Sequence, residues 1–141
     1  SSHFKRLVFL VQKEVAERLT ASPGTKNYGA LSLVIKYFGT AKRLADIKPS
    51  SFFPAPEVTS SIVRIETDTN IQANPALFDF IHIGFRHRRK TLKKNLVMAG
   101  YEGNQVLEAL EKLRLSSDTR AEALSLEMFQ NLWSRLVKAQ G

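Results

Sequence analysis

The sequence RLVFLVQ at residues 6–12 decides the fold class of this chain. Short continuous runs of branched and aromatic residues are typical of strands that are covered on both faces, as in parallel α/β sheets. Residues 13–21 follow at once with a helical pattern whose apolar side chains fall on one side, and Ser22-Pro23-Gly24 ends it. A strand that passes directly into a helix predicts an α/β unit, in which strand 6–12 needs parallel neighbours.

The residues that follow supply further elements but few strands. The pattern predicts a strongly apolar helix at 30–38, a weaker strand at 42–47, a stiff arm at 49–57 and a good strand at 58–66. The order is therefore β-α-α-β-arm-β, which offers too few strands to cover residues 6–12. We expect this part of the chain to be the back half of an α/β domain.

A polar stretch separates this pattern from a helical second half. Residues 68–75 break the apolar periodicity, and Pro75 suits the first turn of a helix. The fold class predicted is α/β followed by an all-α part, with domains at residues 1–68 and 69–141. The helices predicted in the second part are a long or slightly broken one at 76–99 with Gly84 as its weak point, then 104–113, 119–124, and a last helix from the cap Ser125 to about Lys138.

The composition limits the possible functions. Of 141 residues, 43% are hydrophobic and 24% charged, which is ordinary for a globular protein. No apolar run approaches a membrane span of about 20 residues and no segment resembles a signal peptide, so we expect a cytoplasmic location. Cysteine is absent and the three histidines lack a ligand spacing, so we expect no metal site. The excess of 21 Lys and Arg over 13 Asp and Glu, a net charge of +8, favours a polyanionic partner such as nucleic acid.

Six cations lie within nine residues of the second half, and no acid occurs between Phe80 and Tyr101. They are Arg86, Arg88, Arg89, Lys90, Lys93 and Lys94. On a single helix, five of them share one face and the apolar residues occupy the adjacent face. A solvated helix face is the alternative, but such faces usually interleave acids that relieve the repulsion between like charges. We therefore favour a surface that binds the backbone of a nucleic acid.

The arm is the most unusual stretch of the sequence. Residues 50–61 read SSFFPAPEVTSS, so that two aromatic residues stand directly before two prolines. Pro54 and Pro56 fix φ and remove backbone donors, and the arm can therefore form neither a helix nor a central strand. Two large apolar rings, Phe52 and Phe53, are thus placed on a stiff, extended segment.

Four stretches taken together form a specific pattern. They are F-x-P-x-P-x-V-x-S from Phe52, V-Q-K-E-V-A from Val11, P-G-T-K-N-Y-G-A-L-S from Pro23 and F-x-x-R-R-K-T-L from Phe85. Each resembles a motif of the ribosomal RNA adenine dimethyltransferases. The four occur in the order of that family and cover nearly the whole chain.

The resemblance implies a fold and an activity. It implies that residues 1–68 are the C-terminal part of a Rossmann-like methyltransferase sheet and that residues 69–141 form a helical RNA-binding domain. In the full-length protein, S-adenosylmethionine would donate methyl groups to N6 of two adjacent adenines in small-subunit ribosomal RNA during ribosome biogenesis, with that RNA or the pre-30S particle as partner. The glycine-rich cofactor loop and the N-L-P-Y tetrad of the family are not found in this sequence. We therefore expect no catalytic and no cofactor-binding residue here, and no activity of the chain by itself.

The resemblance also implies roles for individual residues. The family extrudes the target adenine and holds it against aromatic rings, and a ring on a stiff arm loses little entropy when a base stacks on it. Phe52 matches the aromatic residue of the motif and Phe53 lies beside it, so both are candidates for contact with the target adenine. The alternative is that both rings cap the core. Lys26 and Tyr28 lie in a loop that matches the family and are candidates for RNA contact, together with the six cations.

Other functions stay open on the sequence alone. The large-subunit ribosomal RNA methyltransferases of the macrolide-resistance type share the F-x-P-x-P arm, although we do not associate R-R-K-T-L with them. A non-catalytic RNA-binding or ribosome-assembly module would carry the same basic segment. A DNA-binding protein resembling the mitochondrial transcription factors derived from this family is a further alternative.

Overall fold

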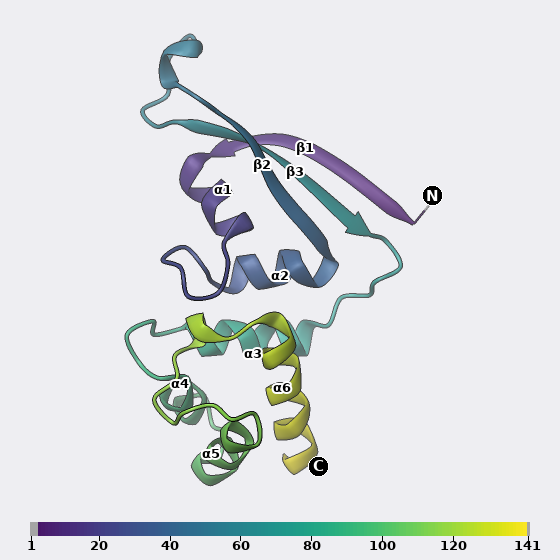
Figure 1. Ribbon diagram of the computed structural model, residues 1–141, viewed down its shortest axis with the longest axis vertical. Helices are drawn as coiled ribbons and strands as arrows, with labels where there is room; N and C mark the ends of the chain where they lie inside the picture. The colour runs from purple at the N-terminus through teal and green to yellow at the C-terminus, as the bar shows by residue number, and fades with distance from the viewer. Residues whose placement is uncertain (1–2, 141) are drawn as a thin grey trace. The chain divides into compact units, whose positions relative to one another are not determined.

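The structure, a computed structural model, describes residues 3–140 and consists of two compact units (Figure 1). The first unit holds the residues up to Ser22 and Lys26–Ala73, and the second holds Pro23–Thr25 and the residues from Asn74 on. The division after Ala73 falls inside the polar stretch 68–75. Within the described part of the chain, no helix is long and apolar enough to cross a membrane.

The first unit is built on a three-stranded antiparallel sheet. Its strands are β1 (Phe4–Gln12), β2 (Gly39–Ile47) and β3 (Ser60–Asp68), in the spatial order β1-β3-β2. The last strand in the sequence therefore lies in the middle of the sheet. This position buries Val63 and Ile65, which are 0% and 7% exposed.

Two helices, α1 (Lys13–Thr20) and α2 (Ala30–Phe38), cover one face of this sheet (Figure 1). Ala16 and Leu19 of α1 pack with Val63 and Ile65 of β3 in the core of the unit. The bounds of α2 are those that the sequence predicts. Gly39 ends α2 and begins β2, and a Cβ added there would stand 1.8 Å from the carbonyl oxygen of Glu66. Only glycine permits this close approach of β2 to β3.

Strand β1 differs from the expectation for residues 6–12. Its neighbour among the described residues is β3, which runs antiparallel, and the parallel neighbours that the apolar run predicts are not present there. Leu7 and Phe9 pair with Ile65 and Val63 and share their face, whereas Val8 points to the opposite face. The large apolar side chains of β1 that remain exposed are Phe4, Leu7, Val8, Phe9 and Leu10. The continuous apolar run thus forms a strand, but the described residues cover it incompletely.

The second unit is entirely helical. Its elements are α3 (Pro75–Phe85), α4 (Leu92–Met98), α5 (Gly103–Lys112), the 3-10 turn η2 (Ala121–Ala123) and α6 (Leu126–Gln140). Large side chains from all four helices are fully buried between them: Leu77, Phe80, Ile81, Leu92, Leu96, Leu110, Phe129, Leu132 and Leu136. Aromatic edges meet in this core, where the ring centroids of Phe80 and Phe129 lie 6.3 Å apart.

The ends of these helices follow local capping rules. The Asn74 side chain accepts a hydrogen bond from the Leu77 N–H at 3.2 Å, and Pro75 occupies the first turn of α3. The Ser125 hydroxyl accepts one from the Met128 N–H at 3.2 Å, as the sequence predicts for the last helix. The predicted helix at 119–124 is shorter, because only Ala121–Ala123 forms a 3-10 turn.

Of the two forms predicted for residues 76–99, the single long helix is wrong, because residues 86–91 leave the helical path between α3 and α4. The predicted break occurs there. Gly84 is not the weak point of that helix. It lies inside α3, where an added Cβ would stand 3.0 Å from Leu92 Cδ1 and 3.2 Å from a ring carbon of Phe129. Its small size therefore serves the packing of neighbouring helices.

Candidate nucleic-acid interface

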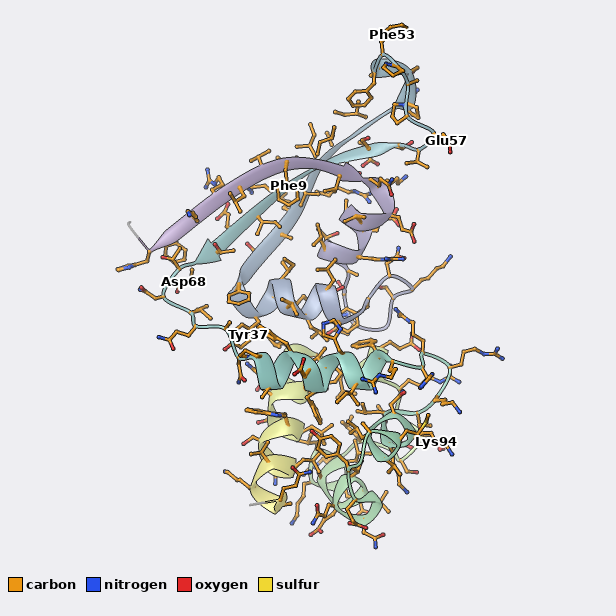
Figure 2. The ribbon with its side chains drawn as sticks, turned by 180° about the vertical axis from the view of Figure 1, so that it is seen from behind. Phe9, Tyr37, Phe53, Glu57, Asp68 and Lys94 are labelled. Atoms are coloured by element: carbon orange, nitrogen blue, oxygen red, sulfur yellow. The ribbon has the colours of Figure 1, made fainter. Side chains whose placement is uncertain are left out.

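The two aromatic residues of the arm between β2 and β3 differ in their exposure to solvent. The turn η1 (Pro49–Ser51) opens the arm, and the Phe52 N–H donates to the Pro49 carbonyl at 3.1 Å. Phe52 is half-buried, whereas Phe53 is 102% exposed and stands at the far end of the arm (Figure 2). The interpretation that Phe53 caps the core is therefore wrong. Full burial of a phenylalanine stabilises by roughly 1.5–3 kcal/mol, so a partner that covers this ring gains a comparable amount.

A hollow of about 370 Å³ lies at the base of the arm. It is lined by Gln12, Lys13, Glu14, Glu17, Val58 and Thr59. The Lys13 N–H donates to the Thr59 carbonyl at 3.0 Å, which ties the start of α1 to the point where the arm enters β3. These lining residues were not predicted as site residues. The V-Q-K-E-V-A motif was the one signal for part of them, whereas their meeting with residues 58 and 59 depends on strand pairing.

Charged groups beside this hollow are paired with each other. The Ser61 hydroxyl donates to Asp46 Oδ1 at 2.6 Å, while Lys13 Nζ and Arg43 Nε lie 3.8 and 3.6 Å from the Asp46 carboxylate. The Ser61 hydrogen bond is the largest effect and lowers the pKa of Asp46; desolvation opposes it, and the charges of Arg43 and Lys13 lower the pKa further. Arg43 also lies 3.6 Å from Glu17. Asp46 is therefore an ionised anchor rather than a proton donor at neutral pH.

The basic segment, residues 86–94, spans a loop and the start of α4. Arg86, His87, Arg88, Arg89 and Lys90 are exposed, as is Lys94, whereas Lys93 is half-buried. The single cationic helix face predicted for these residues is therefore wrong, since residues 86–91 form a turn. The cations are nevertheless neighbours along the chain. Apolar residues on either side, Ile81, Leu92 and Leu96 among them, are buried as the helical pattern predicts.

The cations of the basic segment have little compensation by acids. Among residues 3–140, the side chains of Arg86, Arg89, Lys90, Lys93 and Lys94 form no ion pair with a carboxylate. The Arg88 guanidinium lies 5.7 Å from the centroid of the Phe85 ring, within the range of a cation–π interaction. The five cations without a carboxylate partner attract an external polyanion.

The two candidate residues in the loop before α2, Lys26 and Tyr28, differ in solvent exposure. Lys26 is exposed. Tyr28 is 0% exposed, burial raises the pKa of its hydroxyl to about 12, and Lys36 Nζ lies 5.8 Å from its ring centroid. We therefore assign Tyr28 to the core and not to an RNA contact. The segment between α1 and α2 lies at the opposite end of the first unit from the arm between β2 and β3 (Figure 1).

Comparisons with known proteins agree on one family. The family model described as ribosomal RNA adenine dimethylase matches residues 1–138. The chain is 49% identical over 118 residues to a ribosomal RNA small subunit methyltransferase A of Deinococcus radiodurans, covering 83% of this chain and 40% of that protein. It is 41% identical over 137 residues to the protein of the same name in Synechocystis sp., covering 94% of this chain and 48% of that protein. The chain thus spans about half the length of the relatives it matches.

Solved structures extend the comparison to the fold. A dimethyladenosine transferase from Plasmodium falciparum superimposes with a TM-score of 0.79 at 25% identity, over 96% of this chain and 58% of that one. The 23S rRNA methyltransferase ErmE superimposes with a TM-score of 0.61 at 18% identity, over 94% of this chain and 55% of that one, a likeness that shows the fold alone. The match of the family model over residues 1–138 establishes that the chain belongs to the ribosomal RNA adenine dimethylase family.

Proposed function

We propose that this chain is the substrate-receiving part of an enzyme that dimethylates N6 of two adjacent adenines in small-subunit ribosomal RNA. The methyl donor of the full-length protein is S-adenosylmethionine, and its partner is small-subunit ribosomal RNA or the pre-30S particle in the cytoplasm. The names of the relatives at 49% and 41% identity support the small subunit as the target. The large-subunit alternative has less support, because the 23S rRNA methyltransferase ErmE shares only the fold, at 18% identity.

Two observations in a chain of this family carry this proposal: an exposed aromatic arm in the first unit, and in the second unit five cations of the basic segment, Arg86, Arg89, Lys90, Lys93 and Lys94, that form no ion pair among the described residues. The arm offers Phe53, fully exposed, and Phe52, half-buried, to an extruded base. Stacking of one base on an aromatic side chain contributes roughly 1–3 kcal/mol. The basic segment supplies the sequence-independent contacts to phosphate, which position the RNA and dominate affinity. Lys26, exposed in the loop before α2, is a further candidate for phosphate contact.

The hollow at the base of the arm does not fit S-adenosylmethionine. The hollow at the base of the arm has one large apolar side chain in its lining, Val58, beside two carboxylates and one ammonium. An adenosyl group needs apolar walls for its ring as well as polar contacts. We therefore assign the cofactor to residues of the full-length protein other than those in this hollow, and derive no catalytic step from it. The residues of this chain bind and orient RNA.

A salt titration of RNA affinity tests the basic segment in the full-length protein. Replacing Arg89 and Lys93 by alanine should weaken binding about equally for all structured RNAs. It should also flatten the dependence of log affinity on log salt by roughly 0.7–0.9 per lost contact. The matched control is Lys5→Ala with Lys42→Ala, which removes the same charge from the exposed sheet strands β1 and β2. If the folded Arg89 and Lys93 variant keeps the wild-type salt slope, the basic segment is a solvated surface that does not bind RNA.

Steady-state kinetics of the full-length enzyme test the arm. Phe52→Ala or Phe53→Ala should lower kcat by more than it raises KM, because one stacked base adds little affinity beside many phosphate contacts. Phe52→Tyr and Phe53→Tyr are the controls, since each keeps an aromatic face. If KM rises while kcat is unchanged for both alanine variants, the rings contribute only to general binding.

A further inference from the structure

The turn that carries the cations is fastened by one buried amide, that of Asn95 in α4. Asn95 is 3% exposed. Its side-chain oxygen accepts the His87 N–H at 3.1 Å. Its side-chain nitrogen lies 3.1 Å from the Gly84 carbonyl oxygen, 3.0 Å from that of His87 and 3.3 Å from that of Thr91. A single side chain therefore contacts the last turn of α3, the second residue of the turn 86–91 and its last residue.

The side-chain amide of Asn95 has both the donors and the acceptor that the backbone groups around it require. The last carbonyls of α3 lack partners within the helix, because a helix leaves its final acceptors unpaired. Asn95 supplies donors to these carbonyls and an acceptor to an N–H, which only an amide does from one side chain of this size. Its two N–H groups serve three carbonyl oxygens, so that at least one hydrogen is shared.

Additional bonds hold the same turn at its edges. The Lys90 N–H donates to the His87 carbonyl at 3.0 Å, and the Leu92 N–H donates to the Thr119 carbonyl at 2.8 Å. The Thr91 hydroxyl accepts the Lys94 N–H at 3.1 Å and begins α4. The backbone is thus fixed, while the long cationic side chains between these points extend to solvent. Without the central bonds, repulsion among those cations would favour an expanded, variable turn.

We propose that Asn95 is a positioning residue that holds residues 86–91 in one conformation, so that their cations meet an RNA backbone as a preformed set. The inference rests on the proposed RNA contact of the basic segment. A turn that is ordered before binding avoids the loss of conformational entropy on association. The cations also act together, and the number of phosphates engaged at once sets the salt dependence of affinity. Asn95 itself touches no RNA, since it is buried.

The test compares Asn95→Leu with Leu110→Ala in the full-length protein. Both substitutions place an uncharged apolar side chain at a buried site of the second unit, but Leu110 lies in α5, outside residues 86–91 and α4. Asn95→Leu should weaken affinity for structured RNA by about tenfold, the cost of ordering the turn on binding, and should flatten the salt slope. Leu110→Ala should leave both near the wild-type values at a temperature where the variants are folded. Equal effects of the two substitutions, or a folded Asn95→Leu protein with wild-type affinity and slope, would overturn the proposal.

Hydrogen exchange of the wild-type protein tests the same inference without a variant. The His87 amide should be protected well beyond the Arg89 amide, since the former donates to the buried Asn95 oxygen. Rapid exchange of the His87 amide would overturn the proposal even if Asn95→Leu failed to fold. The variant of Arg89 and Lys93 separates this result from a failure of the proposed function. If that variant weakens RNA binding and Asn95→Leu does not, the basic segment binds RNA and Asn95 is merely structural.

Discussion

Apolar side chains of similar size are exposed on strand β1 of the first unit and buried between the helices of the second. Phe4 and Val8 of β1 are 64% and 57% exposed, whereas Leu96 and Phe129 of the second unit are 0% exposed. The difference does not arise from composition, since β1 is one of the most apolar runs of the chain. It arises because four helices enclose one another, while an edge strand needs a further layer and a further strand. Apolar content predicts a tendency to be buried, and topology decides whether the burial occurs.

The largest test of this comparison replaces one phenylalanine in each region by alanine. Phe129→Ala should lower the free energy of unfolding by about 3–5 kcal/mol, because a fully buried ring leaves a cavity. Phe4→Ala should cost less than about 1 kcal/mol, because the ring is mostly in water already. Urea denaturation of both variants measures the difference. Similar losses would mean that β1 is as well covered as the helical core.

A smaller effect is expected where the sheet itself is tightly built. Gly39→Ala places a Cβ 1.8 Å from the Glu66 carbonyl oxygen and must move backbone, so we expect a loss of about 1–3 kcal/mol. Gly103→Ala is the control in the helical unit, where the nearest atom would be 3.8 Å away, and it should change stability by less than about 0.5 kcal/mol. The urea midpoints of the two variants test this, and a neutral Gly39→Ala would show that β2 and β3 separate easily.

The exposed strand should also make the isolated chain associate. An unpaired edge with apolar side chains on both faces pairs readily with a second copy. Val8→Lys should lower the association constant by about tenfold, since burial of one valine contributes roughly 1.5 kcal/mol. Val137→Lys, at an exposed position of α6, should leave association unchanged. Sedimentation over a range of concentrations provides the measurement. A strict monomer with protected amides at residues 7–11 would contradict this prediction.

The smallest effect concerns pH and the polar edge of the sheet. The Ser61 hydrogen bond lowers the pKa of Asp46 in the folded state, so the unfolded state binds the proton more tightly. The stabilisation by this carboxylate is therefore present above about pH 4, the unfolded pKa, and is lost as pH falls through the lower folded pKa. Asp46→Asn should differ from wild type in urea midpoint near neutral pH, and the difference should shrink on acidification. A difference that is independent of pH would contradict the lowered pKa.

Local signals determined much of the secondary structure. The helix at 30–38, the cap at Ser125 and the start of α3 at Pro75 follow from residues within a few positions of each other. The two rings before Pro54 and Pro56 identified the arm, because proline restricts the backbone wherever it occurs. The charge of the basic segment and the four family motifs are likewise properties of the sequence, and the match of the family model confirms the resemblance they indicated.

Only the tertiary structure decided how these parts meet. The break at 86–91 is bonded to Asn95, whose partners become neighbours only when α4 folds back beside α3. The burial of Tyr28 and the exposure of Phe53 depend on which surfaces pack, and residue type does not encode this. The central position of β3 requires the pairing of strands distant in sequence, and so does the hollow where Lys13 meets Val58 and Thr59. Sequence periodicity reports on neighbours within a turn or a strand, whereas these features arise from contacts across the fold.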